Sequence, residues 1–407
     1  MQSSGWAIGS LLFLTLIGAA PQIGAETSAP PAEPVRARDL GVPFDGTPGP
    51  LNAITDVAGV EVGHTTLISG SGQLVPGKGP VRTGVTAILP RGKTYDPVFA
   101  GWFSLNGNGE MTGTTWVEES GWLEGPVMIT NTHSVGTVRD ATIEWARKRE
   151  YFRALVKRPD TFWMLPVVAE TYDGNLNDIN GFHVKNEHVF AALDQAKPGP
   201  VAEGNVGGGT GMITHGFKGG IGTSSRVVAL DEGSYTVGVL VQSNYGIRDT
   251  FTVAGVPVGR EITELAIDFR DQDQEVGSII IVIATDAPLL PHQLKRLARR
   301  ATMGIARNGS YAANGSGDIF IAFSTANPGA WKREGEAMVT SLPNDSMSSL
   351  FRAVVEATEE SVLNAMVAAR TMTGIDGNTA YALPHDRLQD ALRKYGRLEE
   401  PKKAAMK

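Results

Sequence analysis

The stretch Gly277–Thr285 has the sequence GSIIIVIAT, and we expect the rest of the fold to be arranged around it. Its apolar and β-branched residues follow a charged segment and end at Asp286-Ala287-Pro288, which predicts a strand buried on both faces. Ser278 would then lie at the rim of a sheet. Gly277 in front of it supplies the backbone freedom that a strained turn needs.

The Gly277-Ser278 pair becomes a candidate catalytic centre if the bond between the two residues is cut. Ser278 would then be an N-terminal residue, whose own α-amine can take the proton from the hydroxyl. The α-amine has a reference pKa of about 7.7, against about 10.4 for lysine, so no histidine is needed at neutral pH. From the local sequence alone, a loop dipeptide before a core strand is the simpler interpretation, because the chain contains 49 glycines.

The composition is that of a globular protein and excludes several classes of site. The chain has 407 residues, 42% of them hydrophobic, which suffices for one large domain or two ordinary ones. Its net charge of −7, without a basic cluster interleaved with aromatic residues, argues against a nucleic-acid partner. Cysteine is absent and the 7 histidines are scattered, so we expect no disulfide, no metal site and no other cofactor.

The N-terminal residues 1–25 resemble a secretory signal peptide. They contain no charged side chain, have an apolar centre and end in small residues, and a Pro-rich segment follows. We therefore predict export, to a periplasm, with a mature chain that starts near Glu26 and does not contact the membrane after signal removal. The missing Lys or Arg at the start departs from the usual pattern and leaves an uncleaved membrane anchor as the alternative.

The remaining pattern predicts an α+β fold, in the form of a layered αββα arrangement with little βαβ repetition. Short β-rich runs separated by glycine turns are expected at Ala53–Val62 and at residues 84–90, 126–131, 162–169, 235–241 and 319–324. Helical spacing of apolar residues predicts helices at Pro291–Arg307 and at residues 135–155, 346–370 and 386–395.

Polar residues follow several of these strands. Glu170 and Tyr172 come after the apolar segment 162–169, where a carboxylate is well placed to hold an ammonium group, although a solvated loop explains them as well. Asn244 ends another strand, and its amide could donate a hydrogen bond to an oxyanion or act as a cap. The segment Asn106–Glu110 reads as a tight polar turn.

Two glycine-rich segments complete the pattern. Residues 204–211 lack the Gly-Lys-Ser/Thr ending of a P-loop, so we interpret them as a loop whose backbone must approach something closely, with nucleotide binding as the alternative. Ser316 and Asp318 stand two residues apart at the start of a strand, so their side chains point the same way. Asp318 could then polarise Ser316, which could contact Ser278. A simple turn before a strand is the competing interpretation.

Five segments in this order resemble the β-peptidyl aminopeptidases, the family that also contains the L-aminopeptidase/D-amidase/esterases. They are Glu170-Thr171-Tyr172, the loop 204–212, QSNYG at residues 242–246, Gly277-Ser278 with its strand, and NGSGDIF at residues 314–320. The similarity extends from about Asp39 to Asp386. It implies an αββα sandwich similar to N-terminal nucleophile hydrolases, made as a precursor that cuts itself between Gly277 and Ser278.

The resemblance also implies two associated subunits in one αββα domain. The α-subunit would comprise residues 26–277 and the β-subunit residues 278–407, and such αβ pairs commonly form tetramers. Ser278 matches the nucleophile, with its α-amine and Ser316 assisting proton transfer and Asp318 orienting Ser316. The site further includes a substrate-ammonium ligand, its neighbour and an oxyanion contact, which correspond to Glu170, Tyr172 and Asn244.

These roles predict an aminopeptidase that releases the N-terminal residue from short peptides, amides or esters with a free N-terminus, including β-amino-acid peptides. Ser278 would attack the carbonyl, form an acyl-enzyme as the amine leaves, and pass the acyl group to water. Two alternatives stay open: a self-processing acyltransferase that passes the acyl group to an amine, and an exported ligand-binding protein without enzymatic activity. The second alternative predicts an intact single chain.

Overall fold

The computed structural model describes residues 1–2, 35–154, 158, 161–267, 269 and 276–400. The predicted signal peptide lies outside the described residues except for residues 1–2, and the charged segment 271–275 ahead of Gly277 also lies outside them. Within the described part of the chain, no helix is long and apolar enough to cross a membrane.

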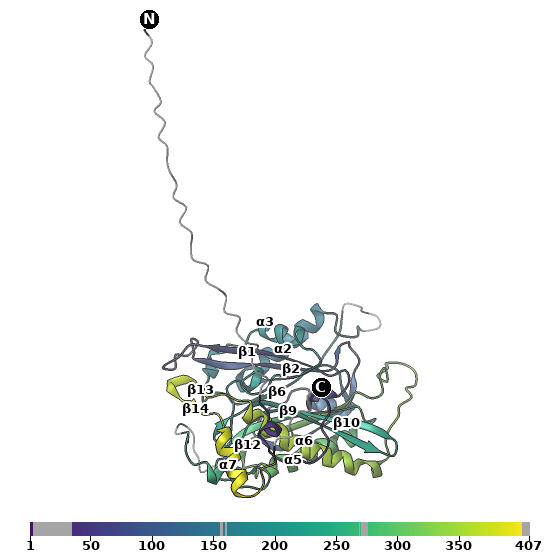
Figure 1. The fold of residues 1–407 in the computed structure, drawn as a ribbon. Coiled ribbons are helices and arrows are strands. Elements are labelled where there is room, and N and C mark those ends of the chain that lie inside the picture. Colours follow the sequence, from purple (N-terminus) through teal and green to yellow (C-terminus); the bar gives the residue numbers. More distant parts are fainter. Residues whose placement is uncertain (3–34, 155–157, 159–160, 268, 270–275, 401–407) are drawn as a thin grey trace. The chain divides into compact units, whose positions relative to one another are not determined.

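Two β-sheets form the centre of residues 35–400 (Figure 1). The four-stranded sheet contains, in spatial order, β1 (Glu61–Ser69), β2 (Val81–Lys93), β5 (Val127–Asn131) and β6 (Val167–Thr171). The six-stranded sheet contains β4 (Trp122–Leu123), β3 (Val98–Gly107), β12 (Gly315–Ser324), β11 (Val276–Thr285), β10 (Gly233–Asn244) and β9 (Gly220–Leu230). Two short pairs join β7 (Ile213–Thr214) to β8 (Phe217–Lys218) and β13 (Met372–Thr373) to β14 (Thr379–Ala380).

Helices cover the outer face of each sheet. The four-stranded sheet carries α2 (Val135–Lys148) and α3 (Asn186–Asp194), at the top of Figure 1. The six-stranded sheet carries α5 (Pro291–Arg307) and α6 (Met347–Val367), at the bottom. The remaining helices are α1 (Thr114–Ser120), α4 (Val258–Glu261) and α7 (His385–Lys394).

Three hydrophobic clusters lie between these layers and confirm the predicted αββα sandwich. One cluster lies between α2, α3 and the four-stranded sheet, and another lies between the six-stranded sheet and α5 and α6. The third fills the space between the sheets, where Ile129 and Ala169 pack with Val282 and Ile321. Successive side chains of β11 point to opposite faces of the sheet, so the strand contributes to two of these clusters. Ile279 and Ile281 face the helices, while Ile280 and Val282 face the other sheet. The strand is therefore buried on both faces, as predicted.

Each sheet contains one parallel pair with a helical crossover, which the sequence did not indicate. In the four-stranded sheet, β5 and β6 are parallel and α2 connects them. In the six-stranded sheet, α5 connects the parallel strands β11 and β12. Parallel strands start at the same edge of a sheet, so the N-terminal ends of β11 and β12 lie side by side.

The structure also corrects several predicted elements. Ala53–Val62 is not a strand: residues Ile54–Asp56 form a 3₁₀ turn, and β1 begins only at Glu61. In the segment 162–169, only the last residues enter β6. The helix predicted at residues 135–155 ends at Lys148, whereas the helix Pro291–Arg307 has the predicted bounds.

Candidate active site

Ser278 lies at the N-terminal end of β11, in the middle of the six-stranded sheet. Six aliphatic residues that are fully buried follow it and fix the strand between β10 and β12. The serine itself is 3% exposed, and among the described residues its Oγ has no hydrogen-bond partner. A buried hydroxyl without a partner is costly in a purely structural position, so this site is a candidate for function.

Gly277 continues the ladder in front of Ser278. Its φ is +146°, a conformation that L side chains rarely adopt, which explains why glycine precedes the serine. In the parallel ladder with β12, Gly277 pairs with Ser316 and Ser278 pairs with Gly317. Both residues of the predicted cleavage bond are thus held in one extended strand.

Ser316 and Asp318 are fully buried at the start of β12 and contact each other. The hydroxyl of Ser316 donates to Oδ1 of Asp318 at 2.7 Å, as the spacing of two residues predicted. Because Ser278 pairs with Gly317, strand alternation turns Ser316 and Asp318 to the opposite face of the sheet from the side chain of Ser278. The predicted contact between Ser316 and Ser278 is therefore not made in the uncut strand.

Glu170 belongs to β6 of the other sheet and is 3% exposed. Its Oε1 accepts the backbone N–H of Glu110 at 2.9 Å, and its Oε2 accepts the hydroxyl of Thr132. Burial raises the pKa of Glu170, although these two hydrogen bonds oppose the shift. The result is a desolvated carboxylate that gains strongly from a cation.

Asn244 ends β10 directly opposite Ser278 in the antiparallel ladder. Its Oδ1 accepts the N–H of Ile213 at 2.8 Å, and its Nδ2 donates to the carbonyl of Tyr172 at 3.0 Å. The N–H of Ile213 fixes which end of the amide is oxygen. The second hydrogen of Nδ2 is not used by these contacts.

The loop after β6 closes one side of the site. Tyr172 is 46% exposed, while Asp173 next to it is fully buried and accepts a hydrogen bond from Asn177 at 3.0 Å. Burial raises the pKa of Asp173 to about 6. Asp173 therefore anchors the loop, and Tyr172 remains at the surface.

These groups meet in one cavity of about 740 Å³ between the two sheets. Five of the seven predicted site residues line it, namely Glu170, Tyr172, Asn244, Gly277 and Ser278. Its wall also contains Asn108, Gly109, Thr132 and Asn175. A carboxylate from one sheet and a hydroxyl from the other thus face a common space that is large enough for a small ligand.

The glycine-rich loop, residues 204–211, packs against β10, the strand that ends at Asn244. A Cβ on Gly208 would lie 2.1 Å from Oε1 of Gln242, which confirms the predicted close approach of its backbone. Lys218 is fully buried, and its Nζ donates to the carbonyls of Met212 at 2.7 Å and Gly219 at 2.9 Å. Burial lowers the pKa of Lys218 to about 7. Met212 directly precedes Ile213, whose N–H donates to Asn244, so the lysine steadies the backbone that orients Asn244.

Sequence reasoning missed Thr132 and the contribution of residues 108–110. Thr132 directly follows the predicted strand at residues 126–131, and the parallel pairing of β5 and β6 brings it beside Glu170. A hydroxyl after one parallel strand and a carboxylate at the end of its neighbour were the signal that could have found it. Lys218 carried no comparable signal.

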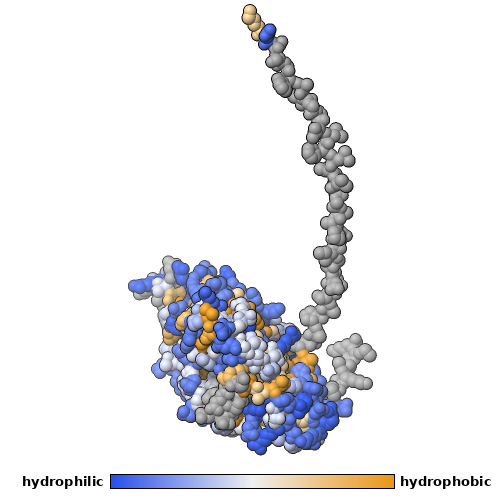
Figure 2. All heavy atoms as spheres, turned by 90° about the vertical axis from the view of Figure 1, so that its left-hand side faces the viewer, coloured by the Kyte–Doolittle hydropathy of each residue, from blue (hydrophilic) through white to orange (hydrophobic). Residues whose placement is uncertain are grey.

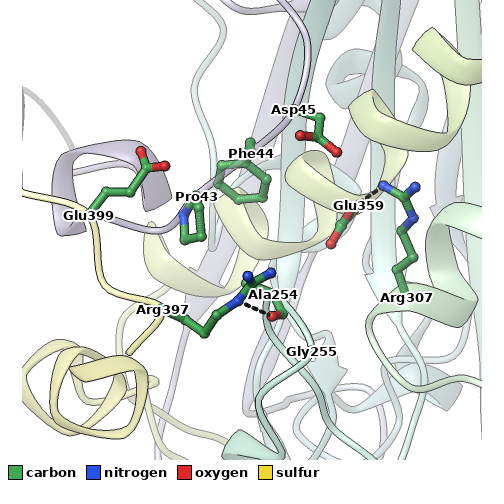
Figure 3. A pocket seen from close by; sticks show the side chains of 9 residues that line it. All are labelled: Pro43, Phe44, Asp45, Ala254, Gly255, Arg307, Glu359, Arg397 and Glu399. Atoms are coloured by element: carbon green, nitrogen blue, oxygen red, sulfur yellow. Dashed lines mark hydrogen bonds and ion pairs between the residues drawn. The ribbon is translucent and has the colours of Figure 1, made fainter. Parts of the chain in front are cut away.

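A separate hollow of about 440 Å³ lies away from these residues (Figure 3). Arg307 in its wall pairs with Glu359 at 2.8 Å, and Arg397 donates to the carbonyl of Ala254 at 3.1 Å. Its lining contains no serine, threonine or histidine and none of the predicted site residues. The hollow is therefore not the candidate active site.

Several known proteins are similar in sequence to this chain. The profile of peptidase family S58 matches residues 52–380. The β-peptidyl aminopeptidase BapA of Sphingosinicella microcystinivorans is 57% identical over 384 residues, which cover 91% of this chain and 95% of the relative. The protein of the same name from Sphingosinicella xenopeptidilytica is 53% identical and covers 87% of this chain and 90% of its own length.

Solved structures are also similar to this chain in fold and sequence. The L-aminopeptidase D-Ala-esterase/amidase of Ochrobactrum anthropi, described as a variant of the Ntn hydrolase fold, has a TM-score of 0.82 at 52% identity and covers 89% of this chain and 99% of its own. A β-aminopeptidase from Burkholderia sp. has a TM-score of 0.79 at 49% identity, with coverages of 89% and 99%. The fold and the resemblance expected from the sequence are both confirmed: the chain belongs to peptidase family S58.

Proposed function

We propose that the chain is a self-processing serine aminopeptidase. It releases the N-terminal residue from short peptides, amides or esters that carry a free amine, β-amino-acid peptides included. The observation that carries this proposal is that Glu170 and Ser278 line the same cavity. The carboxylate binds the substrate ammonium, and the hydroxyl attacks the neighbouring carbonyl. The names of the relatives support the same activity.

Maturation begins at the Gly277-Ser278 junction. The Oγ of Ser278 attacks the carbonyl carbon of Gly277, the C–N bond between the two residues breaks, and the proton moves from the hydroxyl to the new α-amine. Water then hydrolyses the ester and leaves a carboxylate on Gly277 and a hydroxyl on Ser278. Cleavage frees Ser278 from its backbone tether, so it can turn toward Ser316 and Asp318 as a new N-terminus.

In the catalytic cycle, the α-amine of Ser278 takes the hydroxyl proton as Oγ attacks the substrate carbonyl. The Ser316-Asp318 pair relays and stabilises that proton, and Asn244 donates its second N–H to the oxyanion. The scissile C–N bond then breaks, and the amine released from it leaves with the proton. Water then releases the acyl group from Oγ.

Asn244→Ala is expected to lower kcat about 100- to 1,000-fold with little change in KM, because the lost N–H acts mainly on the transition state. Steady-state kinetics on an amide substrate measures this split. Ser243→Ala is the neighbouring comparison, since the hydroxyl of Ser243 contacts Thr214 rather than the cavity. A rise in KM at constant kcat would assign Asn244 to substrate binding.

The two subunits are expected to remain together after cleavage because their strands are interleaved. β11 and β12 follow the cut, yet they pair with β10 and β3, which precede it. Separation would break ladders on both sides of the central strand pair.

We further propose export through residues 1–25 and assembly of αβ pairs into a homo-oligomer. Exposed apolar side chains such as Ile68, Trp163 and Phe182 are available for contacts between copies, and Figure 2 shows apolar groups scattered over one hydrophilic face.

A denaturing gel with N-terminal sequencing tests the proposal. We expect two bands, one of which starts at Ser278-Ile279-Ile280, in protein that hydrolyses amides with a free amine. A single uncut band in active protein would contradict the self-processing mechanism. Cleaved protein that transfers acyl groups only to amines would identify an acyltransferase instead.

A further inference from the structure

The polar turn Asn106–Glu110 between β3 and α1, here called the 106–110 turn, contacts both halves of the cavity. β3 belongs to the six-stranded sheet, whereas the turn ends beside β6 of the four-stranded sheet. Neither the proposed chemistry nor the sequence assigned it a role. Its contacts show what it can control.

On one side, the turn is tied to the start of β12. The Asn106 amide donates to the carbonyls of residues 312–313. The side chain of Asn108 donates to the carbonyl of Gly315 at 2.8 Å, and its backbone N–H donates to that of Ser316 at 3.3 Å. β12 is the ladder partner of the strand that carries Ser278, so these bonds fix the turn relative to the nucleophile.

On the other side, the turn holds Glu170. The N–H of Glu110 donates to Oε1 of Glu170 at 2.9 Å. Gly109 lies at the narrow point between the two: a Cβ there would be 3.3 Å from Oε1 of Glu170 and 3.3 Å from Cα of Gly317, the residue paired with Ser278. The turn therefore spaces the carboxylate from the strand of the nucleophile.

We propose that the 106–110 turn selects substrates by the number of carbon atoms between the amine and the scissile carbonyl. This inference rests on the proposed function, in which the ammonium contacts Glu170 and the carbonyl contacts Ser278. The separation of these two protein groups must then match one carbon in an α-amino residue or two in a β-amino residue. A spacer that fixes this separation determines which class reacts faster.

Gly109→Ala tests the spacer directly. The φ of Gly109 lies outside the left-handed region, so alanine fits the backbone, and only the added methyl group meets its neighbours. β12 is held by strands on both sides, so Glu170 yields and moves away from the nucleophile. The ratio of kcat/KM for a β-alanyl over an L-alanyl amide of the same amine is expected to rise about tenfold, at the lower end of the range for one methylene.

Gly107→Ala provides a graded comparison in the same turn. Its Cβ would meet only Oγ of Ser104, at 4.0 Å, so the ratio should change less than with Gly109→Ala. Asn108→Ala, at an exposed residue, removes the bond to Gly315 and should bring the ratio closer to one. An unchanged ratio in Gly109→Ala and Asn108→Ala, in protein that is cut and active, overturns the spacer. Absence of aminopeptidase activity in the parent protein overturns the proposed function instead.

Discussion

Ser278→Ala should leave the chain uncut between residues 277 and 278 and should abolish amide hydrolysis. The substitution removes the one hydroxyl in the cavity that also adjoins the Gly277 carbonyl, so both acyl transfers lose their nucleophile. We expect a fall in kcat/KM of about 10⁴- to 10⁶-fold, as for nucleophile removal in other serine hydrolases. A denaturing gel and an amide assay on the same sample measure the two effects.

The two roles of Ser278 can be separated by co-expressing residues 26–277 and 278–407 as two chains. In this form the cut already exists, so Ser278→Ala affects only the hydrolysis of substrate. Recovery of full activity in the two-chain variant would show that the hydroxyl serves maturation alone. Loss of activity despite correct assembly would assign it both steps. The interleaved strands β10, β11 and β12 make assembly of the two chains the expected outcome.

The strands and helices that the sequence predicted well are those whose burial follows one regular pattern along their length. Ile279 to Ala284 are apolar at every position because both faces of β11 are covered, and such a run needs no knowledge of its neighbours. The helix Pro291–Arg307 has a proline at its first position and apolar residues at helical spacing, so both its start and its buried face can be inferred.

The segment Ala53–Val62 shows why other predictions were wrong. Its β-branched residues favour a strand by local propensity. In the fold, Ile54 packs instead against Gly238 of β10, whose Cβ would lie 2.7 Å from Cα of Ile54. The N–H of Ile54 also donates to the hydroxyl of Thr223 at 2.8 Å. Contacts between residues far apart in sequence overrode the local preference.

The same distinction applies to the site. The hydrogen bond between Ser316 and Asp318 follows from a spacing of two residues along a strand, which the sequence contains. The partners of Glu170 do not follow from such local spacing. Thr132 and Glu110 reach Glu170 only because β5 pairs with β6 and the 106–110 turn crosses between the sheets. The pairing of strands and the path of a turn between sheets are tertiary properties, so Glu170 could be predicted as a candidate ammonium ligand without the groups that hold it.

Glu170→Gln should mature normally and lose its preference for substrates with a free amine. The substitution keeps the size of the side chain but removes the charge that a buried ammonium needs. We expect KM for an L-alanyl or β-alanyl amide to rise about 100-fold, in line with the roughly 2–5 kcal/mol lost when a buried charged hydrogen bond loses one partner. Glu170 lies on the opposite sheet from the cleavage bond, so processing on a gel should match that of the parent protein.

The pH dependence of KM gives an independent readout of the same charge. Burial raises the pKa of Glu170, so in the parent protein the carboxylate is protonated, and ammonium binding is lost, as the pH falls through that raised value. KM should therefore increase on the acid side in the parent protein and stay flat there in Glu170→Gln. The hydroxyl of Thr132 holds Oε2, so Thr132→Val should raise the pKa further and move the acid limb of KM to higher pH. Unchanged KM values and identical acid limbs in the parent and Glu170→Gln would place the ammonium elsewhere in the cavity.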